Sequence, residues 1–302
     1  MNQRLGKQTV TFGEPATILE TAAIVGQKEG EGPIAQSFDI ILEDDKFGEE
    51  TWEKSESRLQ REAALTALKK AKLTPSDINY VLAGDLLNQC VGAHYGMRDL
   101  EIPFLGLYGA CSTMAESLSI GSMLISGGYA DYTMCVTSSH FCSAEKQFRY
   151  PLEYGGQRAP SAQWTVTGAG CAVLAKDGDG PKITHVTTGK IIDMGVSDLN
   201  NMGAAMAPAA IDTLTTHFED TGLKANDYDL ILTGDLGLIG SDILEELMLE
   251  EGYDIRENHN DCGKIIFDIE KQDVHSGGSG CGCCGSVFCG HIIKEIRSGK
   301  YK

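Results

Sequence analysis

The chain has 302 residues, of which 42% are hydrophobic and 23% charged, a composition typical of a globular protein. Its 43 acidic and 25 basic residues give a net charge of −18, which argues against nucleic acid as a partner and against simple electrostatic adhesion to an anionic membrane. No stretch approaches the roughly 18 consecutive apolar residues of a membrane span, and the first residues lack an apolar signal core. We therefore expect no transmembrane segment and no export, and we expect the ten cysteines to stay reduced.

Predicted strands and helices alternate along the chain. Strands are expected at residues 17–25, 80–84, 103–107, 134–137, 169–175, 230–234 and 264–267. Helices are expected at 55–72, 114–124, 210–221 and 241–251, and a Gly- and Cys-rich run at 281–297 ends in a helix. This alternation predicts an α/β fold, in which helices pack on a parallel or mixed sheet.

Two segments of the chain resemble each other. Residues 78–86 read INYVLAGDL and residues 228–236 read YDLILTGDL, and each follows an amphipathic helix and a short polar loop. Chance similarity of two apolar strands is the alternative, but the matching order of elements favours a duplicated fold. We expect two similar halves at 1–180 and 181–302, with a site between them beyond the ends of the strands.

Cys111 lies in the sequence YGACSTM at 108–114, between a predicted buried strand and a predicted helix. The unpaired N–H groups and the positive dipole end of a helix lower the pKa of a nearby thiol and make it a nucleophile. The alternative is a small buried cysteine that packs the start of the helix, which is a common role for a free cysteine. The local sequence leaves both interpretations open.

The Gly-Ala-Cys-Ser sequence at a helix start in a duplicated fold resembles the thiolase and ketoacyl synthase III superfamily, in which the cysteine is the acyl-accepting nucleophile. Residues 108–116, 137–142, 150–168 and 273–282 resemble more specifically the dipicolinic-acid-binding, thiolase-like proteins of spore-forming bacteria. The similarity extends through nearly the whole chain. It implies a thiolase-like fold, a homodimer, and a role in binding dipicolinic acid (pyridine-2,6-dicarboxylate) and supporting its uptake into the developing spore. It also implies membrane proteins of the same uptake system as partners, and a place on the cytoplasmic face of the forespore inner membrane.

The chain departs from the catalytic pattern of that superfamily. Condensing enzymes add two polar residues to the cysteine, and one of them, His or Asn, follows the second-repeat strand. Here that place reads Thr233-Gly234-Asp235, whereas His275 retains the other place in a Gly-rich loop. Losing one donor to the developing charge commonly costs on the order of a hundredfold in rate. We therefore expect a non-catalytic binding protein with no cofactor; the alternative is an acyl-transferring enzyme that uses Cys111 and His275.

A dianionic ligand needs local cations and N–H donors in so acidic a chain. Arg149 and Arg158 can each bind a carboxylate, and His140 can donate to a carboxylate or stack on the ring. With Cys111 and His275 they form the predicted ligand-binding set. The alternatives are salt bridges at the surface or a subunit interface for the arginines, and a loop histidine with protein partners for His140. If the ligand enters as a calcium chelate, the arginines matter less.

The C-terminal region adds two expectations. The Cys281-Gly282-Cys283-Cys284 run lacks the two-residue gaps of zinc knuckles, so close packing at a helix start is favoured over a metal site. The superfamily continues with two further strands after its last helix, whereas this sequence stops at Lys302. The second half is therefore expected to lack those strands.

Overall fold

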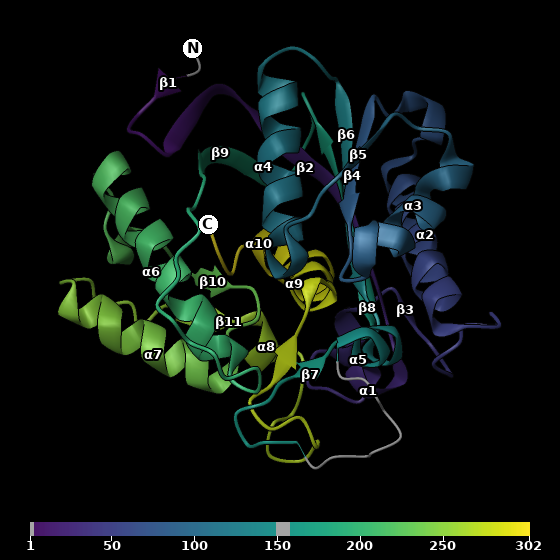
Figure 1. Cartoon of the computed structure of the whole chain (residues 1–302). Helices are drawn as coiled ribbons and strands as arrows, with labels where there is room; N and C mark the ends of the chain where they lie inside the picture. The colour runs from purple at the N-terminus through teal and green to yellow at the C-terminus, as the bar shows by residue number, and fades with distance from the viewer. Residues whose placement is uncertain (1–2, 149–157) are drawn as a thin grey trace.

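A computed structural model describes residues 3–148 and 158–302, and Figure 1 shows how its elements are layered. The largest sheet has eight strands in the described part of the chain, and its central order is β1-β2-β8-β6-β4-β5, with β3 and β9 also pairing with β2. β4 pairs in parallel with β5 and β6, whereas β8 runs antiparallel to β2 and β6. The predicted α/β class is confirmed, with a mixed sheet. The strand bounds are β1 Gln3–Arg4, β2 Thr9–Val25, β3 Ile40–Ile41, β4 Tyr80–Gly84, β5 Phe104–Gly106, β6 Tyr132–Ser139, β8 Gly168–Ala175 and β9 Lys182–Thr187.

Helices cover both faces of this sheet. Figure 1 shows α2 (Trp52–Ala71) and α3 (Val91–Met97) on one side, and α4 (Thr113–Ser126) with α9 (Cys281–Val287) on the other. Each interface is a continuous apolar core in which strand residues alternate between the two faces. A turn of wider pitch at 288–292 joins α9 to α10 (Ile293–Arg297).

The second half of the chain is built around a smaller sheet. β10 (Ile231–Thr233) pairs in parallel with β11 (His259–Asp261), and α6 (Met202–Thr221) and α7 (Gly237–Glu250) pack over them around Phe218, Leu244 and Met248. Another short parallel pair, β7 (Trp164–Thr165) and β12 (Gly278–Ser279), connects the two halves. The remaining helices are α1 (Gln27–Gly30), α5 (Phe141–Phe148) and α8 (Cys262–Ile265).

Most predicted elements are present, but two predictions are wrong. The strand expected at 264–267 overlaps the short helix α8, because the Asp261 side chain accepts a hydrogen bond from the Gly263 N–H and so caps a helix there. The strand expected to be buried at 103–107 is β5, an edge strand whose Leu105 is 40% exposed. β9 lies just after residue 180 in the sequence and joins the large sheet rather than the small one. The boundary between the halves stays a prediction.

The Gly-rich start of α9 allows the helix to lie against the sheet. A Cβ added at Gly170 in β8 would be 2.1 Å from the carbonyl oxygen of Gly285 in α9, and a Cβ added at Gly285 would be 2.7 Å from the Thr137 side chain. Only residues without a Cβ permit so close an approach. This contact fixes the start of α9, and with it the residues that face Cys111.

Within residues 3–148 and 158–302, no helix is both long and apolar enough to cross a bilayer.

Candidate functional site

Cys111 lies where the chain turns from β5 into α4. Residues Ala110–Ser112 form a single 3-10 turn, and Ala110 has a left-handed backbone conformation with φ of 45°. This turn packs against α9, so the thiol is directed toward the junction of the two halves. The sequence prediction that Cys111 precedes a helix is confirmed.

Asp235 faces the Cys111 thiol from the other half of the molecule. It follows β10, is only 4% exposed, and lies close enough to the Cys111 thiol to raise the pKa of that thiol. The same carboxylate accepts hydrogen bonds from the Gly280 N–H at 2.8 Å and from the Ser279 hydroxyl at 3.3 Å. Gln163 fixes the adjacent backbone, since its side-chain amide donates to the carbonyl oxygens of Asp235 and Gly278.

The surroundings of Cys111 raise the pKa of its thiol, whereas the sequence predicts a lowered pKa. Burial and then the neighbouring Asp235 carboxylate raise the pKa of Cys111 well above its ordinary value, although the Gly280 N–H acts in the opposite direction. The prediction that a helix start lowers this pKa is therefore wrong, because burial of the thiol, and after it the Asp235 carboxylate, outweigh the helix dipole. Burial also raises the pKa of Asp235. Both the burial of Cys111 and the nearby carboxylate favour its thiol over its thiolate.

His275 makes a different contact from the one expected of a catalytic partner. Its backbone is left-handed, with φ of 50°, and its Nε2 lies 3.3 Å from a carboxylate oxygen of Asp273. The polar groups that face the Cys111 thiol are instead Asp235, Cys281 and the Gly280 backbone. The recorded ionic contact of His275 is therefore with Asp273, and the pairing of His275 with Cys111 stays a prediction.

Arg158 belongs to a cluster of cationic and aromatic side chains. Phe141 and Trp164 stack with ring centroids 3.8 Å apart and planes 9° from parallel. Lys28 Nζ lies 3.8 Å from the centre of the Trp164 ring, and the Arg158 guanidinium lies 5.0 Å from it. Lys28 also donates to the Asp273 carbonyl oxygen, which brings His275 beside the cluster. We name Lys28, Phe141, Arg158, Trp164 and Asp273 the cation–aromatic cluster.

The protein itself holds Arg158 in this position. Its guanidinium donates to the Gln163 carbonyl oxygen and lies 3.9 Å from the Glu145 carboxylate. Its side chain is only 14% exposed, so it is held much more firmly than a surface arginine. Gln163 contacts Asp235, and the next residue, Trp164, belongs to the cation–aromatic cluster. The two groups of side chains are therefore neighbours across a single strand.

The other predicted ligand-binding residues are placed as follows. His140 is buried, its Nε2 is 2.7 Å from the Asp45 carbonyl oxygen, and its Nδ1 accepts from the Cys142 N–H. Burial lowers the pKa of His140, which favours the neutral ring that this hydrogen-bond pattern requires. Both nitrogens are thus engaged by the protein. Arg149 lies outside the described residues.

The cysteine-rich run packs as expected from its small residues. Cys281 and Cys283 are fully buried, and the Cys281 thiol donates to the Ser138 carbonyl oxygen at 2.9 Å. Among residues 3–148 and 158–302, no group of three or more His, Cys, Asp or Glu side chains is arranged to hold a metal ion.

The internal repeat places two equivalent aspartates in buried positions. Asp85 follows β4 as Asp235 follows β10, and its carboxylate accepts hydrogen bonds from the N–H groups of Leu87 and Ala93. Burial raises its pKa to about 6. In the first half this carboxylate organises the loop that leads into α3, whereas in the second half its counterpart faces Cys111.

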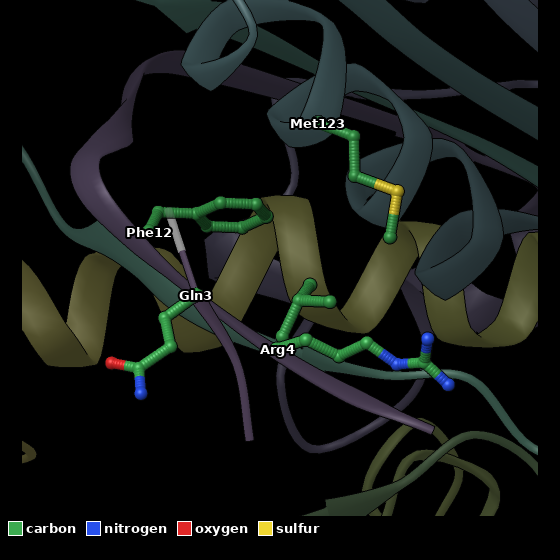
Figure 2. Close-up of a pocket in the computed structure, with 5 residues that line it drawn as sticks. Gln3, Arg4, Phe12 and Met123 are labelled. Carbon is green, nitrogen blue, oxygen red and sulfur yellow. The ribbon is translucent and has the colours of Figure 1, made fainter. Parts of the chain in front are cut away.

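Two surface hollows lie away from these residues. Figure 2 shows Gln3, Arg4, Phe12 and Met123 lining the first, which has a volume of about 260 Å³. The second, of about 510 Å³, lies between α2 and α3 and is lined by Arg58, Arg61, Arg98 and acidic partners. Arg58 pairs with Glu49, and Asp99 pairs with both Arg61 and Arg98, so each arginine of the second hollow already has an acidic partner. Neither hollow contains a residue of the predicted site.

Comparison with known proteins settles the family. A family model described as stage V sporulation protein AD matches residues 6–302. Stage V sporulation protein AD of Bacillus subtilis (strain 168) is 45% identical over 295 residues, which cover 98% of this chain and 87% of the relative. The chain belongs to the stage V sporulation protein AD family. The resemblance expected from the sequence is thereby confirmed.

Solved structures place this family member in the ketoacyl synthase III fold. The 3-oxoacyl-[acyl-carrier-protein] synthase III of Aquifex aeolicus superposes with a TM-score of 0.59 at 13% identity, covering 95% of this chain and 92% of that chain. Cerulenin-bound OleA of Xanthomonas campestris superposes with a TM-score of 0.60 at 15% identity, covering 95% of this chain and 90% of that chain. At such low identity the likeness establishes the fold alone.

The sequence missed Lys28 and Trp164 as components of the site. Trp164 lies within the 150–168 stretch that carries the family resemblance, which was a usable signal. Lys28 lies far from every recognised motif, and only the folded chain brings it to the ring.

Proposed function

We propose that this protein binds dipicolinic acid and supports its uptake into the developing spore, without acting on it chemically. Membership of a sporulation protein family supports the biological setting. The partners in this proposal are membrane proteins of the same uptake system, which the protein would meet on the cytoplasmic face of the forespore inner membrane. A second copy of the chain completes the proposed assembly as a homodimer.

The buried Asp235 carboxylate near Cys111, in the place where the sequence pattern expects a catalytic His or Asn, is the observation that carries the non-catalytic part of this proposal. Acyl transfer to cysteine needs a thiolate and donors aimed at the thioester oxygen. Asp235 instead favours the protonated thiol and occupies the Gly280 N–H. The alternative of an acyltransferase that uses Cys111 and His275 is not favoured, since His275 pairs with Asp273.

The cation–aromatic cluster supports a planar dianion as the ligand. Lys28 and Arg158 supply two positive charges beside flat aromatic rings, in a chain whose net charge is −18. A ligand carboxylate at Cys111 would instead meet the carboxylate of Asp235, and like charges repel strongly at a buried site. We therefore propose that Arg158 and Lys28 hold the two carboxylates. His275 lies beside the cluster, and Arg149 stays a proposed contact of the ligand. Cys111 and His140 are proposed to support the fold around the cluster.

Calorimetric titration of the full chain with dipicolinate tests the proposed function. Benzene-1,3-dicarboxylate is a matched control, because it keeps the spacing of the carboxylates and lacks the ring nitrogen. We expect saturable binding of dipicolinate, and binding should persist in the presence of a calcium chelator because protein cations neutralise the ligand. Absence of binding both with and without calcium would overturn the proposal. Binding only with calcium would show that the chelate, rather than the dianion, is the ligand.

A further inference from the structure

Glu29, a buried acidic residue, is joined to the cation–aromatic cluster at two points. It follows Lys28 in α1, and only 1% of its surface is exposed. Its Oε1 accepts a hydrogen bond from the Thr167 N–H at 3.0 Å, and the Thr167 hydroxyl accepts one from the Phe141 N–H at 3.0 Å. Phe141 is the ring that stacks on Trp164. One carboxylate is therefore linked both to a cation of the cluster and to the backbone that carries one of its rings.

The surrounding backbone holds the Glu29 side chain in place. The Gly26 N–H donates to the Thr167 carbonyl oxygen at 2.8 Å, and a Cβ added at Gly26 would lie 2.7 Å from Oε2 of Glu29. The next turn of chain is also tied down, because the Lys28 carbonyl oxygen accepts from the Gln272 side chain at 2.8 Å. A change in the charge of Glu29 therefore acts on the cluster and is not relieved by rotation of the side chain into water.

The ionisable groups around Glu29 and the cluster come from several segments of the described chain. α1 also packs against residues 35–37 and β3, which carry no ionisable side chain. Burial raises the pKa of Glu29 to about 7, although the Thr167 hydrogen bond and the neighbouring ammonium group lower it. The carboxyl group thus titrates where a nearby change in charge decides its protonation. The ionisable neighbours are Lys28, Glu31, Glu145, Arg158, Asp273 and His275.

We propose that Glu29 couples the binding of a dianion at the cation–aromatic cluster to the uptake of a proton by its own carboxylate. An ionised Glu29 offsets the charge of Lys28 and repels a ligand carboxylate held there, whereas a protonated Glu29 does neither. The ligand therefore binds the protonated form more tightly, and by reciprocity its binding favours protonation of Glu29. The proton comes from the buffer and forms an O–H bond on the carboxylate.

This coupling fixes the direction of the pH dependence. Affinity is highest below the pH at which Glu29 ionises in the free protein, and it falls as the pH rises through that point. Both ligand carboxyl groups stay ionised in this range, because an ordinary carboxylic acid has a pKa of about 4. The inference rests on the proposed function, since it concerns the regulation of the same site.

Calorimetric titration of the full chain with dipicolinate, in HEPES and in Tris, counts the protons taken up. The two buffers differ in ionisation enthalpy, so each proton that the buffer supplies changes the observed heat of binding. Near pH 7.5 the wild type should take up at least about a quarter of a proton per ligand. Its dissociation constant should rise at least about threefold between about pH 6 and pH 8.5.

Three variants assign the proton. Glu29→Gln keeps the size of the side chain and an oxygen for the Thr167 N–H, so it should bind without proton uptake and with an affinity that is nearly independent of pH. Asp85→Asn removes another buried carboxylate, which accepts from Leu87 and Ala93, and should keep the wild-type uptake. His275→Asn removes the imidazole beside the cluster, and asparagine tolerates the left-handed backbone there. It should also keep the wild-type uptake.

The outcomes separate this inference from the proposed function. No binding by the wild type at any pH would overturn both. Binding without proton uptake, or uptake that persists in folded Glu29→Gln, would overturn the inference alone, as would uptake that is lost in His275→Asn. If Glu29→Gln does not fold, the wild type and His275→Asn decide, because equal uptake by both supports the inference and its absence from either contradicts it.

Discussion

Gly170→Ala should destabilise the protein strongly, because Gly170 lies where α9 touches the sheet. The added Cβ would lie 2.1 Å from the Gly285 carbonyl oxygen and 2.8 Å from its Cα. Both atoms belong to the backbone, so no side-chain rotation relieves the clash, and α9 must move by about 1 Å. Overpacking of this kind costs about 1–3 kcal/mol, and we expect the upper end of that range.

Thermal unfolding measures this cost. At about 2.1 cal/mol/K per residue, the unfolding entropy of the chain is about 0.6 kcal/mol/K, so a loss of about 3 kcal/mol lowers the midpoint by about 5 °C. Gly222→Ala is the matched control, since Gly222 has φ of 72° and no neighbouring atom within 4 Å of an added Cβ. Gly222→Ala should lose only about 1 kcal/mol of stability, from the left-handed backbone, which lowers the unfolding midpoint by about 2 °C. If Gly170→Ala unfolds no earlier than Gly222→Ala, α9 does not lie against β8, and the placement of Gly280 beside Asp235 is wrong.

Three further predictions concern the site and its surroundings. Cys111→Ala should leave the affinity for dipicolinate within about threefold, because only one weak donor is lost; calorimetry showing abolished binding would place the ligand at Cys111. Wild-type protein should release no more free coenzyme A from acetyl-CoA or acetoacetyl-CoA than Cys111→Ala does, and a Cys111-dependent release over many turnovers would refute this. Burial raises the pKa of Glu29 from 4.5 to about 7, so the folded state binds the extra proton and stability should fall by up to about 3 kcal/mol as pH rises through that window. Denaturant unfolding of Glu29→Gln should show a correspondingly smaller fall, and an identical pH dependence in both proteins would contradict the assignment.

The sequence was sufficient to predict the elements that depend on local pattern. β4 has the predicted bounds, Tyr80–Gly84, because its apolar run ends at Gly-Asp and a capped turn precedes it. The repeat of this strand also predicted a second strand just before Asp235, and the structure has β10 there. The failure at 264–267 arose because a run of three apolar residues after Lys264 suits a strand or a helix, and the cap from Asp261 decides between them.

Contacts between distant segments could not be predicted in the same way. A helix-dipole prediction for Cys111 uses only adjacent residues, whereas the pKa of its thiol is raised by burial and then by Asp235, which lies 124 positions away. Lys28 reaches Trp164 across an even longer stretch of chain. Such electrostatic neighbours depend on how the halves pack, and that information is spread over the whole sequence.

The central claim is that the cation–aromatic cluster holds dipicolinate as a dianion, and Arg158→Ala tests it most directly. A charge-assisted hydrogen bond to a carboxylate contributes about 1.5–3 kcal/mol, so the dissociation constant should rise by about 10- to 150-fold. Arg98→Ala is the matched control, because Arg98 also lies over an aromatic ring, that of Tyr95, but far from the cluster in sequence.

Calorimetric titration of the wild type and both variants with dipicolinate gives the answer, once circular dichroism has shown that each variant is folded. We expect Arg158→Ala to lose affinity by at least about tenfold and Arg98→Ala to bind as the wild type does. Wild-type affinity in folded Arg158→Ala, or an equal loss in Arg98→Ala, would contradict the claim that this cluster binds the ligand.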